Sequence, residues 1–288
     1  MTSVDRNPFR PGLLEGRTLL ITGGGTGLGR SMALKCAGIG AKIAIVGRRE
    51  DPLKATVGDI EKAGGKAAFA RCDVRDSGSV RAAFDSVEGA LGPLNALINN
   101  AAGNFLCASE DLSDNAFDSV VRIVLYGTFN CTREIGRRLI ERKAPGHILS
   151  IVTTYAETGS AFVLPSASAK AGVLAMMRSL AVEWATYGIR VNAVAPGPFK
   201  TEGAFSRLLV GELERQALKR VPSKRFGDHD ELTNLVAYLL SDASPYQTGD
   251  CVTIDGAEGI FSGQQFAGFA HIDRASAKEM MSAIKPKK

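Results

Sequence analysis

Short apolar runs alternate with longer amphipathic stretches along most of the chain. Seven such runs, rich in Val, Ile, Leu and Ala, span residues 17–21, 42–46, 66–72, 94–98, 147–152, 189–195 and 252–254. The intervening stretches are helical in pattern, most clearly over residues 30–40, about 112–141 and 165–187. Buried strands that alternate with helices form parallel sheets. The pattern therefore predicts an α/β fold, a doubly wound parallel seven-stranded sheet flanked by helices, in a single domain.

A glycine-rich turn follows the first predicted strand and opens the first predicted helix. Residues 22–29 read TGGGTGLG. Glycines let the backbone turn tightly and approach a pyrophosphate, whose negative charge then lies at the helix N-terminus. The arrangement predicts a Rossmann-type nucleotide site. Its expected cofactor-binding residues are Gly23, Gly25, Thr26, Gly27, Leu28 and Gly29.

The ends of the second and third predicted strands bear on the choice of cofactor. Arg48 and Arg49 stand after the second strand, where an Asp or Glu would bind the ribose hydroxyl of NAD. Arginine in this place accommodates the 2′-phosphate of NADPH, although two solvated arginines opening a helix are an alternative. Asp73 and Val74 end the third strand, where an adenine would lie. We expect NADPH as the cofactor.

Three side chains between residues 153 and 170 form the candidate chemistry. Ser166 and Lys170 are four residues apart and share one helical face, whereas Tyr155 follows the strand 147–152. They converge only if the strand end and the helix start lie side by side. Taken singly, the Tyr is an ordinary packing residue and the Lys an ordinary solvated one. Together with the nucleotide turn, they predict an active site.

A stretch without strand pattern, residues 202–230, follows the sixth predicted strand. Long connections inside compact domains are usually functional lids. Six cations are candidates for binding a phosphorylated substrate, and a solvated helix face is the equal alternative: Arg207, Arg215, Lys219, Arg220, Lys224 and Arg225. We expect an N-terminal extension over residues 1–12, the domain over 13–258 and a C-terminal tail over 259–288.

Composition argues against several classes of function. The net charge of +5 comes without a basic run interleaved with aromatic residues, which argues against nucleic-acid binding. Five scattered cysteines without a CxxC pair indicate a reducing compartment, and the three histidines are too far apart to predict a metal site. Neither a signal peptide nor an apolar run long enough for a membrane span is present. We expect a cytoplasmic protein without a metal.

The motifs TGGGTGLG, NNAAGN and PGPFKT, in this order and spacing, resemble the short-chain dehydrogenase/reductase family over about residues 13–258. The segments YAETG, SASAK, NAAGNF and GAFSR resemble the NADPH-dependent 2,4-dienoyl-CoA reductases within it. The resemblance implies a homotetramer with subunit contacts on the exposed apolar faces of the helical runs 112–141 and 165–187. It implies further cofactor contacts at Asn100, Ala101, Lys170, Pro196, Gly197, Phe199 and Thr201. It implies substrate contacts at Asn104, Phe105, Tyr155, Ser166, Phe205 and Arg207.

Departures from the general family pattern refine the expected reaction. Ser166 stands where most members carry Tyr, Thr153 stands where they carry Ser, and Val124 stands where they carry a helical Asn. A ketone reductase needs an acid for the new alkoxide, and a serine hydroxyl is too weak an acid for this role. Conjugate reduction of a dienoyl thioester instead needs hydrogen-bond donors to the thioester oxygen, which the resemblance assigns to Tyr155 and Asn104.

The resemblance, together with these departures, therefore implies NADPH-dependent reduction of a fatty 2,4-dienoyl-CoA to a trans-3-enoyl-CoA in the β-oxidation of unsaturated fatty acids. The expected catalytic residues are Tyr155, Lys170, Asn104 and Ser166, with Lys170 on the nicotinamide ribose. One alternative is a reductase of 3-oxoacyl thioesters or other carbonyls, with Tyr155 as proton donor. Another is an inactive NADPH-binding sensor or scaffold, which the retained Lys170 and the replacement phenol argue against.

Overall fold

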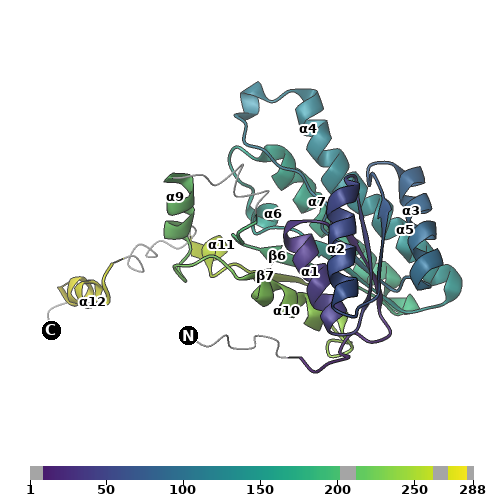
Figure 1. The fold of residues 1–288 in the computed structure, drawn as a ribbon. Coiled ribbons are helices and arrows are strands. Elements are labelled where there is room, and N and C mark those ends of the chain that lie inside the picture. Colours follow the sequence, from purple (N-terminus) through teal and green to yellow (C-terminus); the bar gives the residue numbers. More distant parts are fainter. Residues whose placement is uncertain (1–8, 202–211, 262–271, 284–288) are drawn as a thin grey trace.

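The computed structural model describes residues 9–201, 212–261 and 272–283. Its core is one parallel sheet with the strand order β3-β2-β1-β4-β5-β6-β7 (Figure 1). The strands are β1 Thr18–Thr22, β2 Lys42–Gly47, β3 Ala67–Arg71, β4 Ala96–Asn99, β5 Gly146–Ile151, β6 Ile189–Pro196 and β7 Cys251–Ile254. The predicted seven-stranded parallel sheet is confirmed.

Helices cover both faces of this sheet (Figure 1). One apolar core lies beneath α3 (Ser77–Leu91), α5 (Gly127–Arg142) and α7 (Leu164–Trp184). The core on the other face lies beneath α1 Gly27–Gly38, α2 Glu50–Lys62 and α10 His229–Leu240. Successive residues of each strand enter opposite cores, as Leu19 and Leu20 of β1 do, because side chains alternate across a strand.

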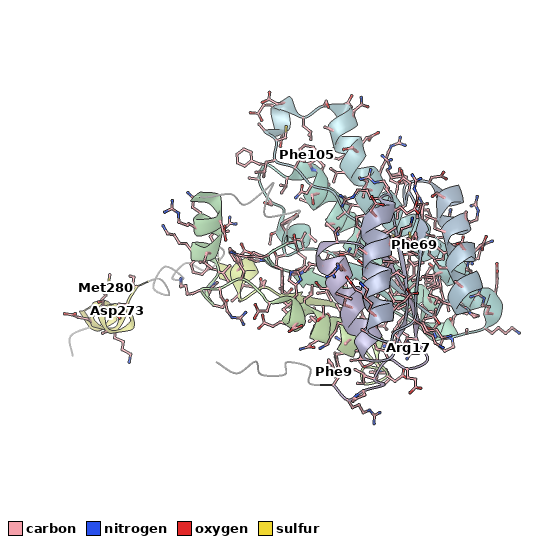
Figure 2. The ribbon with its side chains drawn as sticks, in the orientation of Figure 1. Phe9, Arg17, Phe69, Phe105, Asp273 and Met280 are labelled. Atoms are coloured by element: carbon pink, nitrogen blue, oxygen red, sulfur yellow. The ribbon has the colours of Figure 1, made fainter. Side chains whose placement is uncertain are left out.

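Further α-helices among the described residues are α4 Asp114–Val121, α6 Tyr155–Thr158, α9 Glu212–Arg220, α11 Glu258–Phe261 and α12 Arg274–Ala283, and short 3-10 turns lie at Ser109–Asp111 and Ala185–Tyr187. Figure 2 shows α12, marked by Asp273 and Met280, standing away from the sheet. No helix in the described part of the chain is long and apolar enough to cross a bilayer.

The strand order reverses between β1 and β4, which are neighbours in the sheet although β2 and β3 come between them in the chain. Such a reversal opens a crevice at the carboxyl ends of the strands, where ligands of doubly wound sheets bind. The glycine turn after β1, the segment after β4 and the loop after β6 all start at this edge. The topology thus gathers the sequence motifs at one place.

The helical run predicted for residues 112–141 contains a turn that the apolar pattern does not indicate. A π-helix, Arg122–Tyr126, joins α4 to α5. Val124 is buried inside it, and its carbonyl accepts a hydrogen bond of 2.6 Å from the Thr128 hydroxyl. The wider turn shifts the helical phase. Tyr126, the last residue of the π-helix, and Phe129 in the first turn of α5 are both exposed.

The predicted lid is partly helical. Residues 212–220 form α9, and the described residues between α9 and α10 form no strand beyond one isolated bridge of Gly227 with Phe199. The residues preceding α9 in this stretch, 202–211, lie outside the described part, and so do the expected substrate contacts Phe205 and Arg207.

Candidate active site

The turn between β1 and α1 is built for close approach of a ligand to the backbone. Gly23 and Gly27 have positive φ values of 67° and 53°, which other residues rarely adopt. A Cβ at Gly29 would lie 2.3 Å from the carbonyl oxygen of Gly23, so the helix packs directly on the turn. Thr26 is the N-cap of α1, but its side chain makes no capping hydrogen bond. The first amides of α1 therefore remain available to an anion.

Asn100 and Ala101 hold this turn from the end of β4. Both backbone amides donate to the Thr22 hydroxyl at 2.9 Å, and the Asn100 side-chain amide donates to the Thr22 carbonyl at 2.9 Å. Thr22 is the last residue of β1, so these bonds fix the point where the glycine turn leaves the sheet. The structure thus gives Asn100 and Ala101 a part in shaping the turn.

The candidate phosphate site beyond β2 carries two exposed arginines, Arg48 and Arg49. No hydrogen bond or ion pair joins either guanidinium to another described residue. The carboxylate of Asp73 interacts electrostatically with Arg48. It accepts hydrogen bonds of 2.5 and 2.9 Å from the guanidinium of Arg75. The hydrogen bonds from Arg75 lower the pKa of Asp73. Both arginines therefore remain able to bind a phosphate.

Val74 has a different environment from the one expected for an adenine contact. Its side chain is buried in the core beneath α3 and α5, and a Cβ at Gly127 would lie 2.5 Å from it. Its carbonyl accepts a hydrogen bond of 2.9 Å from the Asn130 side chain. This placement supports a packing role for the Val74 side chain.

A cavity of about 1610 Å³ opens at the carboxyl ends of the strands. It brings together ten of the residues expected to bind cofactor or substrate: Leu28, Asn100, Asn104, Tyr155, Ser166, Lys170, Pro196, Gly197, Phe199 and Thr201. Phe105 is not among the lining residues, and its ring packs against the core. The structure therefore does not support a substrate contact for Phe105.

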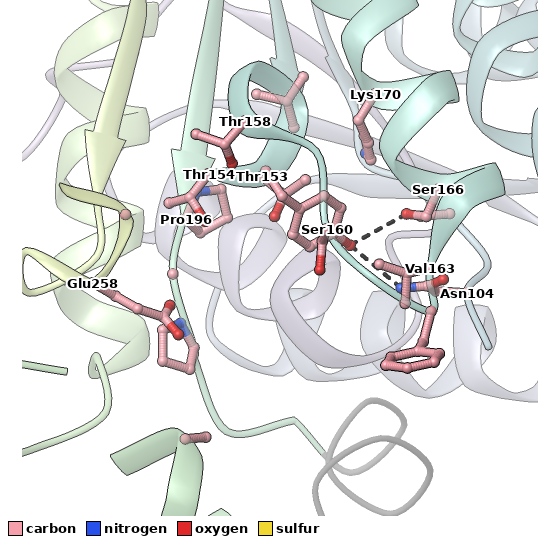
Figure 3. Close-up of a pocket in the computed structure, with 18 of the residues that line it drawn as sticks. Asn104, Thr153, Thr154, Thr158, Ser160, Val163, Ser166, Lys170, Pro196 and Glu258 are labelled. Atoms are coloured by element: carbon pink, nitrogen blue, oxygen red, sulfur yellow. Dashed lines mark hydrogen bonds between the residues drawn. The ribbon is translucent and has the colours of Figure 1, made fainter. Parts of the chain in front are cut away.

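Hydrogen bonds join the Tyr155 hydroxyl to the side chains of Asn104 and Ser166, both labelled in Figure 3, where dashed lines mark the two bonds. The Asn104 amide nitrogen donates to this hydroxyl at 3.3 Å, and the Ser166 hydroxyl lies 3.2 Å away. The Asn104 amide oxygen accepts the backbone amide of Phe105 at 2.9 Å, which fixes its NH₂ group toward Tyr155. Three groups that can donate hydrogen bonds thus meet at one point of the wall.

Tyr155 reaches this point from the short helix α6, which begins at Tyr155 shortly after β5 ends at Ile151. Ser166 lies in the first turn of α7, next to Pro165. The expectation that the strand end and the helix start lie side by side is thus met, with a short helix between them.

Lys170 lies one turn beyond Ser166 and is buried, with 8% of its surface exposed. Its ammonium donates to the carbonyl of Ile151, the last residue of β5. Burial lowers the pKa of Lys170 to about 8. An ammonium has three protons, so two remain to serve a ligand in the cavity that Lys170 lines.

Two of the three departures from the family pattern lie at or near this site. Thr153 lines the cavity beside Tyr155, whereas Val124 is buried in the π-helix and does not line it. An apolar residue at position 124 cannot hydrogen-bond through its side chain. The polar side chains that line the cavity around Tyr155 include those of Asn104, Thr153, Ser166 and Lys170.

Several residues that line the cavity were not predicted from the sequence. Glu258 of α11 lines the cavity, and its carboxylate lies 3.4 Å from the Arg220 guanidinium of α9. Burial raises the pKa of Glu258 despite this arginine. Other residues that were not predicted are Leu106, Cys107, Thr154, Thr158, Phe162 and Gln216. The only signal for Glu258 in the sequence is its place directly after the last strand and its Asp-Gly turn.

The structure divides the lid cations into two groups. Lys219 and Arg220 line the cavity. Arg225 instead makes two bonds, of 2.6 and 2.8 Å, to Glu231 of α10. The described residues contain no group of three or more His, Cys, Asp or Glu side chains that could hold a metal.

Comparison with known proteins identifies the family. The family model described as "Enoyl-(Acyl carrier protein) reductase" matches residues 23–257. An uncharacterized oxidoreductase of Caenorhabditis elegans is 47% identical, over 91% of this chain and 85% of the relative. A probable 2,4-dienoyl-CoA reductase of the same organism, named as (3E)-enoyl-CoA-producing, is 42% identical over 91% and 87%. One of Bacillus subtilis, named as (2E)-enoyl-CoA-producing, is 42% identical over 85% and 97%.

Solved structures agree with this relationship. A short chain dehydrogenase from Bacillus anthracis is 41% identical with a TM-score of 0.77, over 84% of this chain and 96% of that one. A putative 2-deoxy-D-gluconate 3-dehydrogenase from Agrobacterium tumefaciens with bound NADP is 30% identical with a TM-score of 0.79, over 87% and 99%. With its doubly wound parallel sheet and its glycine turn, the chain belongs to the short-chain dehydrogenase/reductase family.

Proposed function

We propose that the protein is an NADPH-dependent 2,4-dienoyl-CoA reductase. The observation that carries the proposal is the position of the Tyr155 hydroxyl between Asn104 and Ser166, with a serine where the family pattern has its tyrosine. The names of the relatives from C. elegans and B. subtilis, each 42% identical, support it. The residues suit stabilisation of a negatively charged oxygen better than protonation by the side chain at position 166.

A member of this family uses a nicotinamide cofactor, and the residues present fit one. The uncapped amides of α1 suit the pyrophosphate, and the buried Lys170 ammonium suits the nicotinamide ribose. We infer that Arg48 and Arg49 select the 2′-phosphate of NADPH, because no carboxylate stands in their place at the end of β2. Bound NADPH would supply the hydride.

Conjugate addition of a hydride to C5 of a 2,4-dienoyl thioester shifts an electron pair along the diene to the thioester oxygen. Tyr155 O–H and the second Asn104 N–H are placed to donate to that oxygen, while the Ser166 hydroxyl donates to the phenol oxygen. Lys170 adds a positive charge to the same wall. The electron pair then returns to carbon, which takes up a proton.

The carbon that takes the proton decides the product. Protonation at C2 leaves a 3-enoyl thioester, whereas protonation at C4 leaves a 2-enoyl thioester. We infer the trans-3 product, as in the name of the C. elegans relative. Ser166 is placed to position the water that delivers this proton, since its hydroxyl lies beside Tyr155 in the cavity wall.

A fatty acyl-CoA is the proposed substrate. The cavity, of about 1610 Å³, is larger than a typical small-molecule pocket, and its apolar lining includes Leu106 and Phe162. Lys219 and Arg220 at the α9 side offer positive charge to the phosphates of coenzyme A. We therefore expect the acyl chain on the apolar side and the nucleotide part of the substrate near α9.

The deciding experiment compares two thioesters. We expect purified protein to oxidise NADPH with 2,4-hexadienoyl-CoA and to leave acetoacetyl-CoA nearly unchanged, as followed by the nicotinamide absorbance. Preference for acetoacetyl-CoA would establish the carbonyl reductase instead, and NADPH binding without either reaction would establish the inactive sensor. The same reaction in D₂O, with NMR of the product, shows deuterium at C2 for a 3-enoyl product and at C4 for a 2-enoyl product.

We also propose that the protein assembles as a homotetramer and is located in the cytoplasm. Exposed apolar side chains on two neighbouring helices support subunit contacts: Tyr126 precedes α5, Phe129 lies on it, and Val182 lies on α7. Light scattering of the purified protein measures the assembly, and a fluorescent fusion of the full chain measures the compartment.

A further inference from the structure

His229, the first residue of α10, bridges two elements that lie far apart in the chain. Its Nε2 lies 2.6 Å from the carbonyl oxygen of Lys200, and its Nδ1 lies 2.6 Å from the Ser31 hydroxyl of α1. A carbonyl only accepts hydrogen bonds, so the Nε2 proton is donated to Lys200. In the neutral ring, Nδ1 then accepts the hydroxyl proton of Ser31.

The two partners of His229 belong to opposite sides of the cofactor crevice. Ser31 lies one helical turn after Gly27, and its hydroxyl is also 3.3 Å from the Gly27 carbonyl. Lys200 lies between Phe199 and Thr201, both of which line the cavity. A Cβ placed on Gly27 would lie 3.6 Å from Thr201, which is ordinary van der Waals contact. The loop after β6 therefore lies against the glycine turn at the place that His229 spans.

The same loop is also held to the segment that precedes α10. Phe199 forms a β-bridge with Gly227, whose amide donates to the Pro198 carbonyl at 3.1 Å. A Cβ at Gly227 would lie 2.3 Å from the Phe199 ring, so only glycine fits at this crossing. These contacts hold residues 198 and 199 to the segment just before α10. Helix α10 itself packs on α1 through an apolar core, and His229 adds a polar bond to Ser31 at the cofactor end of that contact.

We propose that His229 is a positioning residue for the nicotinamide cofactor. By bonding Lys200 and Ser31 together, it sets the spacing between the loop after β6 and the N-terminal turn of α1. A dinucleotide touches both sides of this crevice, so the correct spacing raises its affinity without any contact between cofactor and imidazole. The inference concerns cofactor binding in this family fold and does not depend on the identity of the acyl substrate.

The test measures NADPH binding by fluorescence titration of the full-length protein in the absence of acyl-CoA. We expect His229→Ala to raise the Kd for NADPH about tenfold, because two hydrogen bonds are lost. His229→Gln, whose amide has a donor and an acceptor, should recover most of the affinity. Ser31→Ala, which removes one partner, should have an intermediate effect. Asp230→Ala changes an exposed neighbour on the same helix and should bind NADPH like the wild type.

A second measurement examines the protein without cofactor. Amide hydrogen exchange at Gly227 reports the bond to Pro198 and should quicken in His229→Ala while the amides of β1 and β4 stay protected. An unchanged Kd in His229→Ala would overturn the proposal, as would an equal loss in Asp230→Ala. If His229→Ala loses protection throughout the sheet, Ser31→Ala decides: its Kd must rise with the sheet intact, and an unchanged Kd would refute the proposal.

Discussion

The Tyr155 hydroxyl lies 3.2 Å from the Ser166 hydroxyl, although eleven residues separate them in the chain. Tyr155 comes from the short helix α6, and Ser166 comes from the first turn of α7. In the general family pattern the phenol belongs to position 166 itself. Here a phenol is present beside that position but approaches from another element and is joined by the Asn104 amide. The cavity that Lys170 lines thus still contains a phenol, but the phenol comes from α6 and not from α7, so its hydroxyl donates a hydrogen bond from a different direction than in the general family pattern.

Removal of either donor should slow dienoyl reduction strongly. Tyr155→Phe and Asn104→Ala each delete one hydrogen bond to the oxygen that gains charge, and such a loss typically costs about 100- to 1000-fold in kcat, or roughly 2.7 to 4 kcal/mol. Steady-state kinetics with a dienoyl-CoA measures the loss, and an unchanged Kd for NADPH is the control. If Tyr155→Phe keeps full activity, the assignment of Tyr155 as a donor is wrong.

Substitutions of Ser166 should show whether its hydroxyl supports the Tyr155 phenol or donates directly to the thioester oxygen. Ser166→Ala should lose less than Tyr155→Phe, because the serine hydroxyl acts through the phenol oxygen 3.2 Å away. Ser166→Tyr restores the residue type of the family pattern, but the larger ring would crowd Tyr155, whose hydroxyl lies 3.2 Å from the Ser166 hydroxyl. We expect it to lose dienoyl reduction and to gain no ketone reduction. Rates with both thioesters measure this, and ketone reduction by Ser166→Tyr would contradict it.

Cofactor choice should depend on Arg48. A bidentate bond from its guanidinium to the 2′-phosphate would contribute about 1.5 to 3 kcal/mol, so Arg48→Ala should weaken NADPH roughly 10- to 150-fold and leave NADH unaffected. Parallel titrations with the two cofactors measure the difference. Arg75→Ala is the matched control, since that guanidinium is bound to Asp73. Equal losses for NADPH and NADH would remove Arg48 from this role.

The cations of α9 should act on substrate binding. Lys219→Gln and Arg220→Gln remove positive charge at the cavity, where we place the phosphates of coenzyme A. Loss of uniform binding raises KM for acyl-CoA at nearly unchanged kcat. Lys62→Gln, at the exposed end of α2, serves as a charge-matched control. A fall in kcat with constant KM would point to a role of α9 in the chemical step.

Stability at acid pH should depend on His147. This residue is the second of β5, is 8% exposed, and its Nδ1 finds no hydrogen-bond partner among the described residues. Burial, with smaller effects from the charges of Arg17 and Arg190, lowers the pKa of His147 to about 3. Below the ordinary pKa of about 6.5 the unfolded chain therefore takes up a proton that the fold excludes, so stability falls as the pH drops toward 3.

Each pH unit within that window costs at most about 1.4 kcal/mol from this residue. His147→Leu removes the titrating ring and should flatten the dependence. Urea unfolding at several pH values between about 4 and 7 measures both slopes. Equal slopes for the wild type and the variant would show that other groups control acid unfolding.

The pattern of apolar residues predicted most of the strands, as two of them illustrate. The run at 17–21 became Thr18–Thr22 and the run at 66–72 became Ala67–Arg71, so the boundaries moved by one residue. Strands buried on both faces must be continuously apolar, which makes them readable without a structure. The π-helix at Arg122–Tyr126 left no comparable mark, because one wider turn scarcely changes a helical pattern.

Site residues could be predicted from the sequence where reactive side chains are spaced along one helix. They could not be predicted where segments far apart in the chain come together. Ser166 and Lys170 follow from one helical face, and both line the cavity. Glu258 of α11 lines the same cavity and pairs with Arg220 of α9, a meeting of distant segments that no local pattern indicates. Asn104 lines the cavity and Phe105 does not, because neighbouring residues of an irregular segment can face in different directions, which the sequence does not indicate.

The β-bridge between Phe199 and Gly227 joins the two ends of the segment that contains α9. The closure of a loop with fixed ends depends only weakly on its length, by about 0.6 kcal/mol for each doubling. Exposed residues of α9, such as Arg215 and Lys219, can therefore be exchanged during evolution with little effect on the sheet, whereas Ala217 and Val221 are buried. Proteins that share this fold can in this way change their substrate specificity while keeping the same cofactor site. The bridge therefore lets the substrate-binding segment vary without loss of the folded sheet.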